Sequence, residues 1–415
     1  MAKSNIRAHG EGTLRKRSDG RWEGRIITGY DKKGKPVTRY FYGKKQKDVT
    51  AKMDEVKAEL CMGKYIEPNK ITLGEWLDIW LNTYKKGARP TTRGTYEYII
   101  RVHLKPTLGG ELLRQLQPHQ LQKFFNELLE NGRVQKEKPT AAEKKKRKKE
   151  QPPGLSRATV EKIRTTVKAA LSQAVEDGLL LKNPAKSTKL PEETEKKEVV
   201  PFTSEEAEKF LNSIKGHRQF AAYYIDLFAG LRRGETLGLM WDDIDFEGKT
   251  LKIVRELVSV KDEKTKKYCL IFQPPKTPKS QRTIPMTGDM IKVLKAHKAK
   301  QNEERLFFGA AYHNENLVFC SEDGKRIWPR HFNQQYTILL KKAGIPHKKP
   351  HTMRHTCASL LLDAGEELKV VQEILGHSRI GTTADIYSHL TEKSIEKSLD
   401  KMSTMIKVDL PENSQ

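Results

Sequence analysis

The chain has 415 residues, a length that usually divides into about three folding domains rather than one hydrophobic core. Its 78 Lys and Arg residues outnumber its 53 Asp and Glu residues, and the formal net charge of +25 suits a polyanionic partner. The sequence has no apolar run that could span a membrane, no export signal, and only four widely spaced cysteines without metal-ligand spacing. We therefore expect a reduced cytoplasmic protein without disulfides or a metal site, whose partner is nucleic acid.

The first predicted domain spans residues 1–64. Strand patterns at 13–17, 22–30 and 36–42 are separated by turn sequences, and a helical stripe of apolar residues follows at 45–60. This pattern predicts a three-stranded sheet that packs on one helix. Arginines stud the sheet. On composition alone a solvated basic face is an equally good interpretation, but a sheet can enter the major groove of DNA. The candidate DNA-binding residues of this domain are Arg15, Arg17, Arg21, Arg25 and Arg39.

After a predicted linker at 66–70, the apolar periodicity becomes helical and predicts an all-helical domain over 70–185. One stripe begins at Trp76, a second begins at Leu121, and a third helix begins at the N-cap candidate Ser156 and ends at Gly178. The stripes should form the core. Polar side chains on the opposite faces could contact phosphates, and Thr92, Arg93 and Arg157 are the candidates.

Two segments of this region are predicted to lack a fixed fold. Residues 134–154 include Lys144-Lys-Lys-Arg-Lys-Lys149 between prolines, and this composition is too polar and self-repelling to pack. We expect a disordered insertion, which either adds phosphate affinity or is simply a solvated tether. Residues 182–200 carry prolines and alternating charges and are predicted to be a second linker.

The third predicted domain covers 200–409 and is mostly helical. It opens with a capping-box pattern, Thr203-Ser-Glu-Glu206, and continues with a helix at 220–230. Short β-branched or apolar runs at 251–254, 268–272 and 282–285 predict one small antiparallel sheet. Beyond Met290 the pattern is helical except at 317–320. The fold class is therefore α+β and multidomain: a small β-sheet-plus-helix module, an all-helical domain, and a mostly α domain with a small antiparallel sheet.

The third domain contains a series of motifs in a characteristic order. They read Ala229-Gly-Leu-Arg-Arg-Gly-Glu235, Lys276-Thr-Pro-Lys-Ser-Gln-Arg-Thr-Ile-Pro285, His351-Thr-Met-Arg-His-Thr-Cys-Ala-Ser359, Leu375-Gly-His377 and Ala384-Asp-Ile-Tyr-Ser-His389. Together they resemble the tyrosine recombinase (phage integrase) family. The helical domain resembles the core-site DNA-binding domain of that family. The first domain resembles the arm-type DNA-binding domain of phage and conjugative-transposon integrases, through Gly12-Thr-Leu-Arg15 and Gly20-Arg-Trp-Glu-Gly24.

Cleavage of a DNA phosphodiester without a metal needs an oxygen nucleophile, cations for the charge that develops on phosphorus, and a proton for the leaving 5′-oxygen. The resemblance implies these catalytic residues: Arg232, Lys276, His351, Arg354, His377 and Tyr387. Tyr387 would be the nucleophile, Arg232 and Arg354 would clamp the phosphate, and Lys276 would be the acid. Glu235 would orient the region. Taken singly, each residue has a simpler interpretation, such as a packed tyrosine or a solvated lysine, and Arg233, Lys279 and His355 are neighbouring competitors.

The resemblance implies a site-specific recombinase that integrates and excises a mobile element without a metal or other cofactor. Its partners would be double-stranded DNA at core and arm-type sites, further copies of itself in a tetramer on DNA, and accessory directionality or DNA-bending proteins. A non-catalytic DNA-binding protein and a type IB topoisomerase are the alternatives. An altered Tyr387 or Arg232 would indicate the former, and the extra N-terminal module favours recombination over relaxation. A final apolar stripe at 395–406 predicts a helix that docks on its own domain or on a neighbouring protomer.

Overall fold

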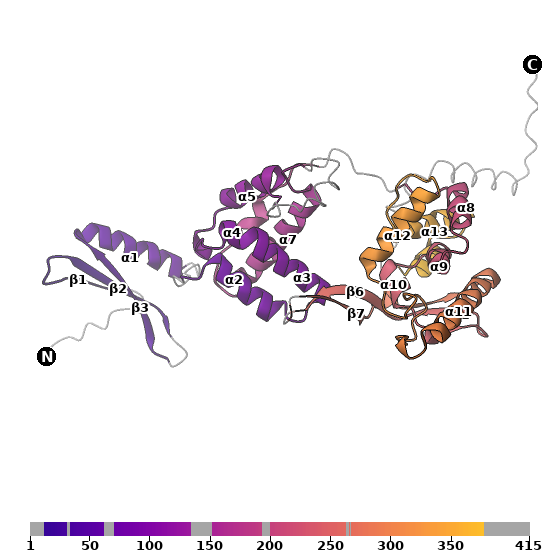
Figure 1. The fold of residues 1–415 in the computed structure, drawn as a ribbon. Coiled ribbons are helices and arrows are strands. Elements are labelled where there is room, and N and C mark those ends of the chain that lie inside the picture. The colour runs from indigo at the N-terminus through magenta and orange to yellow at the C-terminus, as the bar shows by residue number, and fades with distance from the viewer. Residues whose placement is uncertain are drawn as a thin grey trace, which may run out of the picture. The chain divides into compact units, whose positions relative to one another are not determined.

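The structure is a computed structural model, and it describes residues 12–30, 34–61, 70–133, 152–192, 200–262, 265 and 267–376. The chain divides into two compact units, Met1–Thr194 and Glu195–Gln415, and Figure 1 shows their helices and strands. The boundary between the units falls within the predicted linker at 182–200. Among the helices of the described residues, none is long and apolar enough to cross a membrane.

The N-terminal module of unit 1 is an antiparallel sheet with one helix, as predicted. Strands β1 (Thr13–Lys16), β2 (Trp22–Tyr30) and β3 (Pro36–Gly43) pair in that order, and α1 (Gln46–Cys61) packs on the sheet. The core of the module consists of Ile26, Phe41, Val49, Met53 and Val56. A Cβ at Gly24 would lie 2.2 Å from the Met53 sulfur, so the absence of a side chain at Gly24 lets the helix approach the sheet.

The second part of unit 1 is all-helical, which confirms the prediction. Two α-helices continue directly into π-helical turns, and two longer helices follow. The elements are α2 (Leu73–Ile79) with the turn Trp80–Tyr84, α3 (Pro90–Ile99) with the turn Ile100–Leu104, α4 (Lys105–Leu108), α5 (Pro118–Asn131) and α7 (Arg157–Glu176). The Ser156 hydroxyl accepts a hydrogen bond from the Thr159 backbone N–H, so the predicted N-cap is confirmed. The Trp76 indole is buried and donates to the Ala170 carbonyl at 2.9 Å, which joins the first helix to the last.

Parts of both segments that were predicted to lack a fixed fold belong to the packed helical domain. Residues 134–151 lie outside the described part, but the Pro153 carbonyl accepts from the Arg133 N–H, and a Cβ at Gly154 would clash with the Leu129 carbonyl. Residues 152–154 therefore belong to the packed domain. In the predicted linker, the Asn183 amide donates to the Lys168 carbonyl and to the Ser172 hydroxyl, both at 2.8 Å. A short 3₁₀ helix (Pro184–Ser187) consequently packs on the helical core, and the linker prediction is wrong for this stretch.

Unit 2 is mostly helical around one large core. Its helices are α8 (Ser204–Ser213), α9 (Phe220–Phe228), α10 (Arg233–Gly238), α11 (Gly288–Phe308), α12 (Pro329–Lys342), α13 (Thr352–Asp363) and α14 (Leu368–Leu375). The predicted capping box is present, because Thr203 and Glu206 exchange backbone-to-side-chain hydrogen bonds of 3.1 Å. The rings of Phe210, Tyr223 and Tyr336 pack against one another in this core, with Phe210 meeting both tyrosines edge-on.

The strands of unit 2 form two sheets instead of the single predicted one. Strands β4 (Ile244–Asp245), β5 (Thr250–Ile253) and β8 (Arg282–Pro285) make an antiparallel sheet in the order β4-β5-β8. Strands β6 (Glu256–Lys261) and β7 (Tyr268–Gln273) form a separate antiparallel hairpin. The prediction placed the 268–272 run in the same sheet as its neighbours. It was wrong because β6, which was not predicted, supplies the partner of β7.

Candidate active site

Arg232 lies where the backbone turns sharply between α9 and α10. Gly230 has a φ of 58° in this turn, and a Cβ there would also lie 2.4 Å from a Leu375 methyl, so glycine is required. Arg232 is the N-cap residue of α10, and its backbone N–H donates to a Glu235 carboxylate oxygen at 3.0 Å. Its guanidinium donates to the other oxygen of Glu235 at 2.6 Å, and the side chain as a whole remains 31% exposed. The side chain is therefore oriented by a carboxylate but still reaches the surface.

Glu235 is 1% exposed and connects two arginines. One carboxylate oxygen accepts from Arg232, and the other accepts from Arg282 of β8 at 3.0 Å. Burial alone would raise the pKa of Glu235, but the charge and hydrogen bond of Arg282, together with those of Arg232, lower it below the ordinary value. Glu235 is therefore an anion, consistent with the predicted orienting role.

Arg354 is 2% exposed and extends from α13 to two other segments. One terminal nitrogen donates to the Gly230 carbonyl at 2.6 Å, and the other donates to the Leu375 carbonyl. Its Nε has no hydrogen-bond partner among the described residues. Burial, and then the charge of Arg232, lowers its pKa to about 9, so the group is still a cation at neutral pH. Arg354 thus joins three segments and retains one unused donor.

His351 is the N-cap residue of α13, one turn before Arg354. The residue is exposed, while its ring contacts the His355 ring edge-on at a centroid distance of 4.8 Å. Desolvation by surrounding protein atoms, together with the neighbouring His355 and Arg354, lowers the pKa of His351 to about 4. His351 is therefore neutral at physiological pH, and one of its ring nitrogens can accept a proton.

Lys276 lies in the connection between β7 and β8, as predicted, and its side chain is exposed. Within the described part of the chain it has no hydrogen bond or ion pair. The connection ends in a 3₁₀ turn (Pro278–Ser280), where the buried Ser280 hydroxyl contacts the Thr277 hydroxyl at 2.9 Å and donates to the Gly376 carbonyl at 3.4 Å. The loop is thus fixed at Ser280 while the Lys276 ammonium is available.

Three consecutive carbonyls at the end of α14 receive donors from three different elements. Arg282 donates to Ile374 at 2.7 Å, Arg354 donates to Leu375, and Arg232 contacts Gly376 at a longer 3.5 Å. Carbonyls at a helix C-terminus lack partners within the helix and carry a partial negative charge, so they attract cations. The turn itself needs glycine, because Gly376 is left-handed with a φ of 64°. His377 follows directly, but His377, Tyr387 and the 395–406 stripe lie outside the described residues.

The arginines of the N-terminal module do not share one face. Arg15 and Arg17 both bind the buried Glu23 at 2.9 Å, whereas Arg21 pairs with Asp19 in the turn. Arg25 lies in β2 opposite Tyr40, with an exposed side chain. Arg39 pairs with Ile26 in the register and lies over the Phe41 ring at 5.2 Å, on the same side as the module core. The candidate DNA-binding arginines on the open face of the sheet are therefore Arg15, Arg17 and Arg25.

The candidate phosphate contacts of the helical domain are partly engaged within the protein. Arg93 donates to the Leu81 carbonyl at 2.7 Å and to the Asn82 side chain at 3.0 Å. Arg157 donates to the Pro191 carbonyl at 2.7 Å. Thr92, near the start of α3, is exposed.

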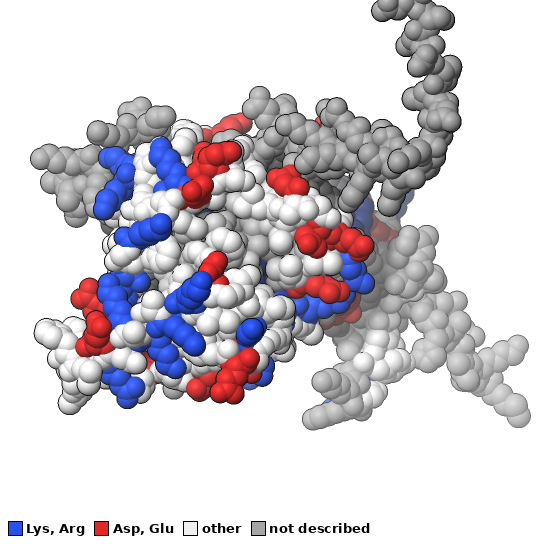
Figure 2. All heavy atoms as spheres, turned by 90° about the vertical axis from the view of Figure 1, so that its right-hand side faces the viewer, with Lys and Arg blue, Asp and Glu red and all other residues white. Residues whose placement is uncertain are grey.

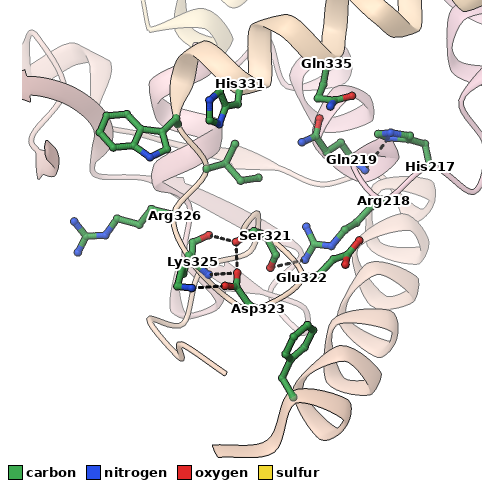
Figure 3. Close-up of a pocket in the computed structure, with 13 residues that line it drawn as sticks. His217, Arg218, Gln219, Ser321, Glu322, Asp323, Lys325, Arg326, His331 and Gln335 are labelled. Carbon is green, nitrogen blue, oxygen red and sulfur yellow. Dashed lines mark hydrogen bonds and ion pairs between the residues drawn. The ribbon is translucent and has the colours of Figure 1, made fainter. Parts of the chain in front are cut away.

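A cavity of about 710 Å³ in unit 2 lies apart from these groups and contains none of the predicted catalytic residues. Figure 3 shows its polar side chains, several of which bind one another. Lys325 pairs with Asp323 at 2.6 Å, and Arg218 pairs with Glu304 at 2.7 Å, so these cations are neutralised locally. A second cavity, of about 520 Å³, borders the site and is lined by Lys279, Arg282 and Gly376 among others.

On the face of unit 2 that Figure 2 shows, the surface charge does not by itself mark a DNA-binding site. On the face that Figure 2 shows, Lys and Arg side chains lie among Asp and Glu side chains rather than in one uninterrupted basic patch. The arrangement of Arg232, Arg354, His351 and Lys276 is therefore more informative about function than the net charge.

Comparison with known proteins identifies the family. The profile of the phage integrase family matches residues 200–394, and that of the phage integrase N-terminal SAM-like domain matches residues 72–129. A XerC-like tyrosine recombinase of Caldanaerobacter subterraneus subsp. tengcongensis is 33% identical over 393 residues, which cover 92% of this chain and 95% of that protein.

Two solved structures share the fold. The Tn1549 transposon integrase in complex with a circular intermediate DNA has a TM-score of 0.62 at 22% identity, covering 80% of this chain and 99% of that one. Lambda integrase, solved as a tetramer bound to a Holliday junction, has a TM-score of 0.50 at 17% identity, covering 88% of this chain and 95% of that one. The chain belongs to the tyrosine recombinase (phage integrase) family, and it is a tyrosine-type site-specific DNA recombinase.

Proposed function

We propose that this recombinase cleaves and rejoins double-stranded DNA through a 3′-phosphotyrosyl intermediate at Tyr387, and that it integrates and excises a mobile element. The observation that carries the proposal is the set of arginine contacts to the Ile374, Leu375 and Gly376 carbonyls. These contacts hold the two residues before His377 against the predicted phosphate-binding arginines, Leu375 against Arg354 and Gly376 against Arg232. The segment that leads to the predicted nucleophile therefore starts beside the predicted phosphate site.

Arg232 and Arg354 would hold the two non-bridging phosphate oxygens. A guanidinium presents several donors in a plane and matches phosphate geometry. The Arg232 side chain is 31% exposed, and while one terminal nitrogen binds Glu235, the other has a long 3.5 Å contact to Gly376 and can turn toward DNA. Arg354 has a buried Nε without a partner among the described residues, which a bound phosphate would satisfy. A free phenol has a pKa near 10, so its ionisation at neutral pH costs about 4 kcal/mol, and these cations would offset much of that cost in the transition state.

His351 and Lys276 would move the protons. As the phenolic oxygen of Tyr387 bonds to phosphorus, the P–O5′ bond breaks. Neutral His351 can take the phenol proton, and Lys276 can give a proton to the leaving 5′-oxygen. His377 would donate to a non-bridging oxygen. Rejoining reverses each transfer, because the phosphotyrosyl bond retains the energy of the broken phosphodiester. This sequence requires no metal or cofactor.

The remaining domains would supply DNA contacts at two kinds of site. We assign the module at 1–64 to distal arm-type sites, with Arg15, Arg17 and Arg25 on its open face, and the domains at 70–185 and 200–409 to the crossover site. The Tn1549 relative is solved with DNA, and the lambda relative is solved as a tetramer on a Holliday junction. We propose the same classes of partner here: DNA and further copies of this chain in a tetramer.

A nicked suicide substrate tests the proposal. With EDTA present, the wild-type protein should become covalently attached to DNA, which a denaturing gel detects as a slower band. Tyr387→Phe should form no adduct. Tyr268→Phe is the matched control, because Tyr268 is 66% exposed and lies outside the proposed machinery, and it should react like the wild type. An adduct with Tyr387→Phe, or a requirement for divalent metal, would overturn the proposal.

A further inference from the structure

We propose that Arg282 is a positioning residue for the leaving-group step: it fastens the loop that carries Lys276 to the Glu235–Arg232 pair and to the end of α14. This inference rests on the proposed roles of Lys276 and Arg232. Arg282 itself does not approach the reacting atoms in the proposed mechanism. It acts through the groups that it holds.

The Arg282 side chain is 6% exposed and is bonded on three sides. Its Nε donates to the Ile374 carbonyl at 2.7 Å, one terminal nitrogen donates to the Ser280 carbonyl at 3.1 Å, and the other donates to Glu235 at 3.0 Å. These acceptors belong to α14, the lysine loop and α10. A guanidinium can serve them together because its N–H groups point outward around a rigid plane. A lysine ammonium is a single point of charge and could not reach all three.

The Ser280 contacts determine how the lysine loop is held. The Ser280 carbonyl binds Arg282, and its hydroxyl contacts both Thr277, the residue after Lys276, and the Gly376 carbonyl. The loop therefore has two attachments to the end of α14, one through Arg282 and Ile374 and one through Gly376. If the Arg282 attachment is lost, the base of the loop loses its link to α10, and its remaining side-chain hydrogen bond to the end of α14 is the 3.4 Å contact between Ser280 and Gly376.

The shared carboxylate couples this attachment to the phosphate clamp. Arg282 is the strongest of the influences that lower the pKa of Glu235 and keep it ionised, and geometry places Arg232 on the other carboxylate oxygen. Two cations and one anion leave a net positive charge for a DNA phosphate. Without Arg282, Glu235 would pair with Arg232 alone. The lysine loop would then no longer be connected to the arginine that contacts the phosphate.

A change of leaving group makes the inference testable. In a substrate whose bridging 5′-oxygen is replaced by sulfur, the leaving thiolate is a much weaker base than an alkoxide and needs no protonation. A defect in the position of Lys276 should therefore slow cleavage of the normal substrate and spare the sulfur substrate. A general defect in folding, DNA binding or phosphate clamping should slow cleavage of both.

Arg282→Lys and Lys276→Ala are compared with the wild type on both suicide substrates. Arg218→Lys is the matched control, because Arg218 also binds one glutamate and two backbone carbonyls, in the cavity away from the site. For Arg282→Lys we expect a loss of about 10-fold or more on the oxygen substrate and less than about 3-fold on the sulfur substrate. Arg218→Lys should show no difference between the substrates.

Equal losses on both substrates for Arg282→Lys, or a loss no larger than that of Arg218→Lys, would overturn the inference. Failure of the proposed function looks different: Lys276→Ala would then show no rescue by sulfur, or the wild type would form no Tyr387 adduct. If Arg282→Lys does not fold, the single variant Glu235→Gln is compared with the double variant Glu235→Gln/Arg282→Gln. Neither of these proteins buries an unpaired carboxylate. Compared with the single variant, the double variant should show a further loss of cleavage rate on the oxygen substrate only. The absence of this further loss would equally overturn the inference.

Discussion

Removal of the Glu235 carboxylate should destabilise unit 2 strongly. Its side chain is fully buried and accepts from the Arg232 guanidinium at 2.6 Å, from Arg282 at 3.0 Å and from the Arg232 backbone at 3.0 Å. Glu235→Ala would leave the nearly buried Arg282 without its anion. Loss of one partner of a buried ion pair typically costs about 3–5 kcal/mol, a large fraction of the ~5–15 kcal/mol that stabilises a domain.

Differential scanning calorimetry of the full chain measures this effect as a shift of the unit 2 transition. For a domain of this size, about 1 kcal/mol corresponds to roughly 2–4 °C, so we expect a decrease of roughly 6–20 °C. Lys292→Ala is the control, because it breaks a pair with the same i,i+3 spacing whose side chains are 82% and 71% exposed. The control should change stability by about 0.5 kcal/mol or less. If the two variants shift the transition equally, the role assigned to Glu235 is wrong.

Three further outcomes are expected. Burial raises the pKa of Asp226 to about 8. Protonation of Asp226 therefore stabilises the folded state at acid pH, and this contribution to the free energy of unfolding is lost as the pH rises through 8. Asp226→Asn should therefore lose less thermal stability than the wild type between pH 6 and pH 9, and parallel losses would contradict this. Removal of residues 1–64 should spare DNA footprints at the crossover site and abolish those at a distal site. Equal loss at both sites would refute the assignment of the N-terminal module to the distal site. Truncation after Leu390 should leave single-site binding nearly intact but reduce synapsis and strand exchange on native gels, and recombination at the normal rate would exclude docking of the tail in a neighbouring protomer.

Local patterns in the sequence predicted much of the fold. The capping groups at Ser156 and Thr203 and the apolar stripes of α5 and α7 depend on residues only a few positions apart, and the structure confirms them. The strand patterns at 268–272 and 282–285 also placed Lys276 in the connection between two strands, as the structure has it. These features could be predicted because helix caps and amphipathic stripes are decided within one or two turns.

The errors concern contacts between distant residues. Whether β7 pairs with β6 or joins the β5–β8 sheet depends on tertiary packing, which strand propensity does not report. The 182–191 part of the predicted linker packs on the helical domain, because the Asn183 amide donates to the Lys168 carbonyl of α7 and Ala185 is buried in the helical core. Arg282 was part of a quoted motif without an assigned role. The position of Arg282 in a predicted strand beside the apolar Ile284 indicates a buried ion pair, but only the structure identifies its partners.

The most direct test of the central claim is the chemical identity of the protein–DNA bond. The adduct trapped in EDTA would be digested with protease and nuclease, and the linked peptide would be sequenced by mass spectrometry. We expect a phosphodiester bond between the phenolic oxygen of Tyr387 and the 3′ end of the cleaved strand. Attachment through another residue, or to the 5′ end, would contradict the mechanism.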